Sequence, residues 1–204
     1  MTRILITAFE PYERWSENSS WLALVELTSW LEPRSQVITR RYPVDLQAAS
    51  DRLRKDLLDR YDYAVHLGQS PGSPVLRIES TGLNLRTDGT PLIEAAPAAY
   101  TTPIAVHPLR DVLLANRIPV EVSHHAGTYL CNALMYLSQH FSAQLNLPTR
   151  SLFLHLPLAP EQVAAAAATM PSASTAMMAK ALSLVIHACE SATAVSRSQS
   201  TRDV

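Results

Sequence analysis

The sequence predicts an α/β protein, a three-layer α/β/α sandwich with a mixed, mostly parallel central sheet. Short apolar runs typical of buried strands alternate along the chain with segments whose apolar residues recur at helical spacing. The chain has 204 residues, of which 47% are hydrophobic, and this suits one globular domain with a sizeable core. We therefore expect a single domain over residues 1–190, followed by a polar, disordered tail at residues 191–204.

The elements of the first half follow from local signals. Strands are expected, from short apolar or alternating runs, at residues 4–8, 36–42, 63–67 and 75–83. The first helix begins at one of the polar residues 18–20 and ends before Pro33. Asp45 caps the second helix, whose apolar residues fall on one face as far as residue 57. In the strand at residues 75–83, Glu79 lies on the face opposite Ile78.

The second half continues the alternation. Residues 86–103 form a loop, because they contain Asp88-Gly89 and three prolines. Strands are expected at residues 119–123 and 152–156, the latter bounded by Pro157. Helices are expected at residues 104–116, 128–141, 160–168 and 174–190, with Thr128 as the cap of the second of these.

Composition excludes several classes of function. The formal net charge is -1, and no basic run is interleaved with aromatic residues, so neither nucleic acid nor an anionic membrane is an expected partner. No apolar run approaches membrane-spanning length, and the N-terminal run is too short for a secretory signal. We therefore expect a cytoplasmic protein in which both cysteines, Cys131 and Cys189, are free thiols.

Cofactor and metal signals are weak. The chain has no G-x-G-x-x-G string, P-loop or G-x-S-x-G elbow, so no cofactor is expected. The adjacent His124 and His125 would point to opposite faces of a strand, and no second pair stands at ligand spacing. No metal site is expected.

Three side chains at or near element ends could carry chemistry. Cys131 falls about one turn into a helix whose partial positive charge favours a thiolate, although an isolated cysteine is more often a small buried hydrophobe. His155 lies in an apolar strand, either satisfied by the backbone or acting as a general base. Glu79 could pair with Arg77 or a neighbouring strand, or it could orient His155. The residues alone do not show that the three meet.

Longer strings carry a family resemblance. They are residues 7–12 (T-A-F-E-P-Y), 42–44 (Y-P-V), 68–84 with Glu79, 126–132 (A-G-T-Y-L-C-N) and 153–157 (F-L-H-L-P). In this order they resemble motifs of the pyroglutamyl-peptidase I family (pyrrolidone-carboxylate peptidases), cysteine peptidases of family C15. The resemblance extends over residues 3–190.

The resemblance implies roles for individual residues. Cys131 would be the nucleophile, His155 the general base and acid, and Glu79 the group that orients His155. The implied reaction removes an N-terminal pyroglutamyl residue from peptides, and a homodimer or homotetramer is implied as the assembly. Substrate binding would involve Phe9 and Tyr12, which match the family's two pocket phenylalanines, and Gly68 and Gln69 of the matching segment 68–84. Arg86, just beyond that segment, is a further expected substrate-binding residue.

Departures from the family pattern leave two other functions open. After Asn84 about six residues of the family's loop are missing by comparison, a loop-scale deletion, and Arg86 stands near the place of the family's loop arginine. A relative that keeps the three residues but acts on another small acyl or lactam substrate is one alternative. A non-catalytic relative is the other, and a scaffold has no physical need for a base beside a thiol.

Overall fold

A six-stranded mixed sheet forms the centre of the computed structural model, which describes residues 1–32 and 35–200. The strand order is β2-β1-β3-β8-β4-β7. The first four of these strands run parallel, and β4 pairs with β8 in the antiparallel sense while running parallel to β7. The strands are β1 Ile4–Phe9, β2 Val37–Tyr42, β3 Tyr63–Gln69, β4 Leu76–Glu79, β7 Val120–Ser123 and β8 Arg150–Leu156.

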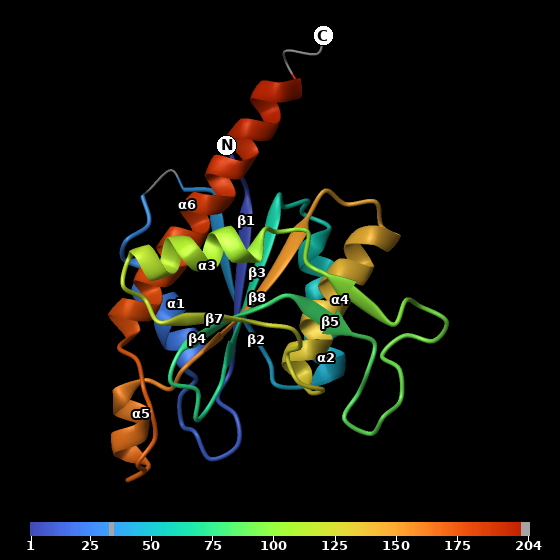
Figure 1. Cartoon of the computed structure of the whole chain (residues 1–204). Coiled ribbons are helices and arrows are strands. Elements are labelled where there is room, and N and C mark those ends of the chain that lie inside the picture. The colour runs from blue at the N-terminus through green and yellow to red at the C-terminus, as the bar shows by residue number, and fades with distance from the viewer. Residues whose placement is uncertain (33–34, 201–204) are drawn as a thin grey trace.

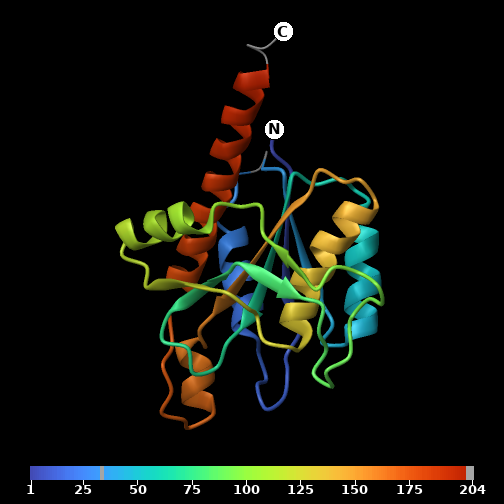
Figure 2. The ribbon, with the colours of Figure 1, turned by 45° about the vertical axis from the view of Figure 1, so that its right-hand side comes forward.

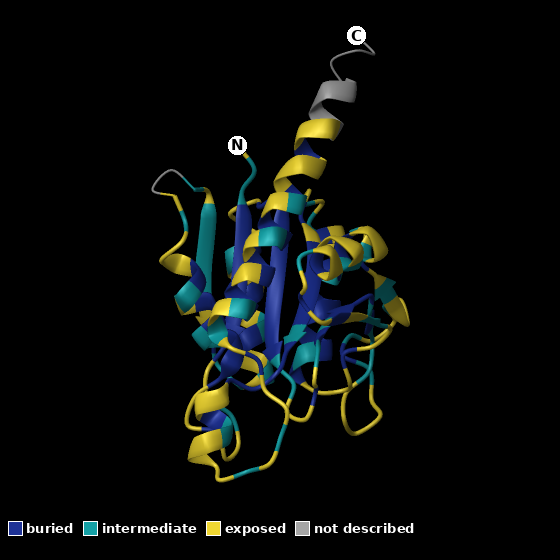
Figure 3. Ribbon diagram, turned by 60° about the vertical axis from the view of Figure 1, so that its left-hand side comes forward, coloured by how far each residue is buried: buried dark blue, intermediate teal, exposed yellow. Residues whose placement is uncertain are grey.

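Helices cover both faces of this sheet (Figure 1). One face packs against α1 Ser19–Thr28, α3 Val106–Ala115 and α6 Thr175–Ser200. The other packs against α2 Leu46–Leu57 and α4 Leu130–Gln144, and the short α5 Pro160–Ala165 follows β8. The central strands lie buried, whereas the edge strand β2 is mostly half-buried, and the outer helix surfaces are exposed (Figure 3). The predicted three-layer α/β/α class is confirmed.

Side-chain alternation in β1 explains how one strand serves both layers. Ile4, Ile6 and Ala8 belong to the core on the α1 side, whereas Leu5 and Phe9 belong to the core on the α4 side. This is the period-two pattern of an extended strand. The strand is almost entirely apolar, Thr7 being the exception, because both faces of the sheet are covered.

The expected caps of the first two helices are present. The Asn18 side chain accepts a hydrogen bond from the backbone N–H of Ser20, and the Asp45 side chain accepts one from Ala48. Each satisfies one of the N–H groups that a helix leaves unpaired at its start. The loop from β1 to α1 lies at the opposite end of the molecule from the two termini (Figure 1).

The strand predicted at residues 75–83 is two strands. The chain leaves the main sheet after Glu79, and β5 Thr81–Leu83 pairs with β6 Ala99–Thr101 in a separate two-stranded sheet. Gly82 explains the path, because a Cβ at this position would lie 2.7 Å from the backbone nitrogen of Tyr136 in α4. The absence of a side chain lets β5 cross directly over the helix. The predicted loop 86–103 therefore contains a strand that local sequence does not reveal.

The C-terminal segment also differs from its prediction. The last helix, α6, continues to Ser200, so residues 191–200 are helical where a disordered tail was expected, and residues 201–204 lie outside the described residues. Thr193 is buried, and its hydroxyl donates to the carbonyl of Cys189 and to the Tyr63 hydroxyl of β3. These contacts hold α6 against the central sheet, and the C-terminal end of α6 then projects beyond the rest of the molecule (Figure 2). No helix among the described residues is long and apolar enough to cross a membrane.

A buried polar chain crosses from the sheet to α4. Hydrogen bonds join His66 Nδ1 to the Thr7 hydroxyl at 2.8 Å and His66 Nε2 to the Ser138 hydroxyl at 2.9 Å. Burial lowers the pKa of His66 from 6.5 to about 3, because a charged ring would lose its hydration. His66 is therefore neutral at physiological pH and links β3 to the helix that carries Cys131.

Candidate active site

Cys131 is the second residue of α4. The helix is preceded by Tyr129 in an extended conformation, with no side-chain cap, so the predicted cap at Thr128 is wrong. The loop reaches the helix through Gly127, whose φ of 80° suits glycine. Cys131 is partly exposed, and first-turn N–H groups have no intrahelical partners. This position places the sulfur at the positively polarised start of a helix.

His155 and Glu79 meet across two antiparallel strands. Glu79 of β4 stands opposite Phe153 of β8, which places His155 two residues farther along on the same face. Such diagonal neighbours are within reach of long side chains. Glu79 Oε1 lies 2.7 Å from His155 Nδ1 and accepts a hydrogen bond from its N–H, and the carboxylate is 1% exposed. Glu79 Oε2 has no hydrogen-bond partner among the described residues.

The thiol and the imidazole are coupled. Burial by itself lowers the pKa of His155, but the charge of a Cys131 thiolate and its hydrogen bond to the ring raise it, as do the hydrogen bond and charge of Glu79. The net result is a pKa of about 9. This pKa keeps the His155 ring protonated at neutral pH, in contact with Glu79 on one side and Cys131 on the other.

Gly68 provides the space for the sulfur. It is the register partner of His155 in the neighbouring strand β3. A Cβ at Gly68 would lie 2.9 Å from Cys131 Sγ and 2.8 Å from the Phe153 ring, both well inside normal contact distance. The bare glycine therefore lets the Cys131 sulfur approach the sheet edge beside His155.

A small pocket opens beside Cys131. The predicted residues Phe9, Tyr12 and Gln69 all line it, at or just after the ends of β1 and β3. Tyr12 stacks on Tyr129 with ring centroids 5.4 Å apart. Other side chains complete the lining: Glu13, Trp15, Asn18, Val44, Pro71 and Leu130. None of these six was predicted as a site residue, although Val44, Pro71 and Leu130 lie within matching strings.

The Tyr12 hydroxyl has a polar partner. A hydrogen bond to Glu13, reinforced by burial and by the neighbouring Tyr129, raises the pKa of Tyr12 to about 12. Glu13 adopts a φ of 53°, an uncommon conformation for a residue other than glycine. The hydroxyl that distinguishes Tyr12 from phenylalanine thus stays neutral at the mouth of the pocket.

Arg86 lies apart from this pocket. Its guanidinium donates to the carbonyls of Pro91 and Leu92 in its own loop. It lines a neighbouring cavity together with Asp88 and Tyr129. The loop is organised by Asn84, whose side chain both donates to and accepts from the backbone of Ile93. The structure therefore gives Arg86 a loop-bracing contact and does not bring it to Cys131.

Asn132 was missed by the sequence reasoning. It is fully buried, accepts a hydrogen bond from the N–H of Leu83 and donates to the carbonyls of Leu83 and Leu85. These bonds tie the first turn of α4 to the end of β5. Asn132 is the last residue of the matching string 126–132, but in that string only the cysteine suggested a chemical role.

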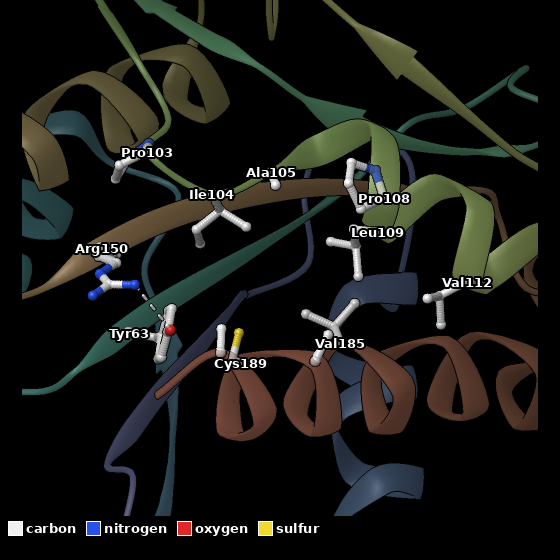
Figure 4. Close-up of a pocket in the computed structure, with 12 residues that line it drawn as sticks. Tyr63, Pro103, Ile104, Ala105, Pro108, Leu109, Val112, Arg150, Val185 and Cys189 are labelled. Atoms are coloured by element: carbon white, nitrogen blue, oxygen red, sulfur yellow. Dashed lines mark hydrogen bonds between the residues drawn. The ribbon is translucent and has the colours of Figure 1, made fainter. Parts of the chain in front are cut away.

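The second cysteine has a different environment. Cys189 lines a cavity of about 310 Å³ between α3 and α6, with mostly apolar neighbours and the hydrogen-bonded pair Tyr63 and Arg150 (Figure 4). Burial, followed by the charge of Glu190, raises the pKa of the Cys189 thiol to about 12. Cys189 is thus a poor nucleophile at neutral pH.

The described residues contain no group of three or more potential metal ligands. Hydrogen bonds engage both adjacent histidines, since His124 bonds the Ser80 hydroxyl and His125 accepts from the N–H of Gly127. These two side chains thus have structural partners in the turn before α4.

Comparison with known proteins shows the family of this chain. The sequence model of the pyroglutamyl peptidase family matches residues 2–192. The chain belongs to the pyroglutamyl peptidase family. It is therefore a cysteine-type peptidase, as predicted.

A pyrrolidone-carboxylate peptidase from Pyrococcus furiosus is 32% identical over 173 residues, covering 79% of this chain and 83% of the relative. One from Pectobacterium atrosepticum is 31% identical over 198 residues, covering 91% and 92%.

Solved structures of the family agree with the fold. A mutant pyrrolidone carboxyl peptidase from Pyrococcus furiosus superimposes with a TM-score of 0.86 at 30% identity, covering 93% of this chain and 99% of that one. The enzyme from Fervidobacterium islandicum gives a TM-score of 0.85 at 31% identity, covering 91% and 97%. The family resemblance seen in the sequence is confirmed.

Proposed function

We propose that this chain removes the N-terminal pyroglutamyl residue from peptides by nucleophilic catalysis at Cys131. The observation that carries the proposal is the arrangement of Cys131, His155 and Glu79. The thiol lies at a helix start and interacts electrostatically with the His155 imidazole, whose Nδ1 is held at 2.7 Å by a buried carboxylate. The names of the family's members supply the substrate.

Acylation begins from the thiolate–imidazolium pair. The Cys131 thiolate attacks the carbonyl carbon of the pyroglutamyl residue, and the carbonyl oxygen becomes an oxyanion. The backbone N–H of Cys131, in the first turn of α4, is positioned to donate to that oxyanion. When the intermediate collapses, the C–N bond breaks and the amine leaves with the proton from His155.

Deacylation uses the same groups in reverse. Neutral His155 takes a proton from water, and the resulting hydroxide attacks the thioester carbon. The carbon–sulfur bond breaks, 5-oxoproline is released, and the thiolate–imidazolium pair is restored. Glu79 touches neither reacting atom, and its bond to Nδ1 holds the ring so that Nε2 faces the sulfur.

The pocket favours a small flat ring. Phe9 and Tyr12 supply aromatic surface, and Gln69 lines the pocket at the end of β3. The placement of Arg86 outside this pocket favours a second candidate, a peptidase of the same mechanism that accepts another small acyl or lactam group. For the first candidate, the partners are peptides with N-terminal pyroglutamate.

Location and assembly extend this proposal. The two free thiols suit a reducing compartment, so we place the enzyme in the cytoplasm. A homodimer or homotetramer remains the expected assembly, and sedimentation of the purified protein tests it. Residues 1–190 are expected to fold as one domain.

Release of a chromophore from a pyroglutamyl amide tests the function. We expect turnover by the wild type, its loss in Cys131→Ser and after thiol alkylation, and its retention in Cys189→Ser as the matched control. Turnover that survives Cys131→Ser contradicts the mechanism. Rapid alkylation of Cys131 without turnover identifies the second candidate, and slow alkylation with no turnover identifies a non-catalytic relative.

A further inference from the structure

The side chain of Gln162 connects the pocket to helix α5. It is 6% exposed, and its Oε1 accepts a hydrogen bond from the N–H of Ala159 at 2.8 Å. Its Nε2 donates to the carbonyl of Glu17 and to Gln69 Oε1, at 2.8 and 2.7 Å. Backbone partners fix this orientation, because the Ala159 N–H can only donate and the Glu17 carbonyl can only accept.

The orientation of Gln69 is fixed in the same way. Its Oε1 accepts from Gln162 Nε2 and also from the backbone N–H of Ser19 at 2.9 Å. Both donors act on the oxygen, so the amide nitrogen is the end of Gln69 left for the pocket that its side chain lines. Asn18, another amide in that lining, is engaged through its oxygen by Ser20 and through its nitrogen by the Glu10 carbonyl.

We propose that Gln162 is a positioning residue for specificity, which holds the amide N–H₂ of Gln69 toward the acyl pocket. The pocket then presents a donor, and it selects acyl groups that carry a hydrogen-bond acceptor on the ring. The lactam carbonyl of a pyroglutamyl group is such an acceptor. This inference rests on the proposed function, since it identifies what one wall of the same pocket reads.

Gln162→Glu tests the arrangement. The carboxylate keeps the acceptor for Ala159 and the length of the side chain, but it cannot donate to Gln69 Oε1. Two oxygens then face each other, so Gln162→Glu repels the Gln69 oxygen, and the single remaining bond from the Ser19 N–H no longer fixes the Gln69 N–H₂ toward the pocket. We expect the KM for a pyroglutamyl amide to rise about tenfold, because the lactam carbonyl loses one hydrogen-bond donor. The change in kcat should be smaller.

Controls separate this role from a general loss of structure. Glu161→Gln changes the charge at the adjacent exposed position and should leave KM unchanged. Alkylation of Cys131 by iodoacetamide should proceed at the wild-type rate in Gln162→Glu, because the thiolate pair is intact. If that variant does not fold, Gln162→Met removes the donors without adding charge, and its KM should rise severalfold.

A double-mutant cycle decides whether Gln162 acts through Gln69. In a Gln69→Leu background, Gln162→Glu should change KM less than about twofold, because the donor is already absent. A further tenfold rise in that background, or an unchanged KM in the single variant, overturns the inference alone. A wild-type protein that releases no chromophore overturns the proposed function and this inference together.

Discussion

Replacing Gly68 by alanine perturbs the nucleophile without touching its chemistry. The added methyl would lie 2.9 Å from Cys131 Sγ and 2.8 Å from the Phe153 ring. Because ordinary contacts begin near about 3.5 Å, the sulfur or the ring must retreat by about 0.6 Å or more. Misplacement on this scale costs on the order of a hundredfold in rate, and overpacking of a core costs about 1–3 kcal/mol. We therefore expect kcat/KM to fall about a hundredfold in Gly68→Ala.

Gly72→Ala is the matched control for this loss of stability. Gly72 has a φ of 85°, so a side chain there is strained, but its Cβ would meet only Met170 at 3.9 Å. We expect a destabilisation of about 1–2 kcal/mol with nearly unchanged kcat/KM. Thermal unfolding and hydrolysis of a pyroglutamyl amide measure both variants. If Gly68→Ala is folded and retains kcat/KM within about threefold of wild type, the close approach of sulfur and glycine is not part of the active geometry.

Three further predictions concern protonation. His155→Ala should lose most turnover and keep its fold by circular dichroism, whereas Glu79→Gln should lose less; unfolding of Glu79→Gln would instead make the carboxylate structural. The kcat/KM of the wild type should decrease above about pH 9, where His155 loses its proton. Glu79→Gln should move this decrease to lower pH, and an unchanged position would contradict the contact of Glu79 with His155. Burial lowers the pKa of His66 from 6.5 to about 3, so the contribution of neutral His66 to stability is complete above pH 6.5 and declines as pH falls, by about 2 kcal/mol at pH 5. In denaturant unfolding, His66→Gln should therefore lose less stability between pH 7 and pH 5 than the wild type. An equal loss in the two proteins would refute this assignment.

The sequence was sufficient where the determining contacts are local. Asp45 lies next to the helix that it caps, and the apolar period that follows needs no distant partner. The chemistry of Cys131 and His155 could be suspected from their positions at element ends, and the family strings connected them. Their contact in space depends on the order of strands, which no local pattern contains.

What the sequence could not provide depends on distant partners. The turn after Glu79 follows from the contact of Gly82 with α4, about fifty residues away. The contacts of Gln162 with Gln69 and Glu17 likewise join segments far apart in the chain. Nothing in the residues next to Gln162 indicates that its side chain contacts Gln69. The helix beyond residue 190 was missed because its polar composition has no apolar period, whereas Thr193 is anchored by a strand.

Trapping of the acyl-enzyme tests the central claim most directly. The wild-type protein is mixed with excess pyroglutamyl amide, quenched in acid during turnover, digested and examined by mass spectrometry. The proposed mechanism predicts one pyroglutamyl group in thioester linkage on the peptide that contains Cys131, and none on the peptide that contains Cys189. Continued turnover with unmodified Cys131, or acylation at another residue, would contradict it.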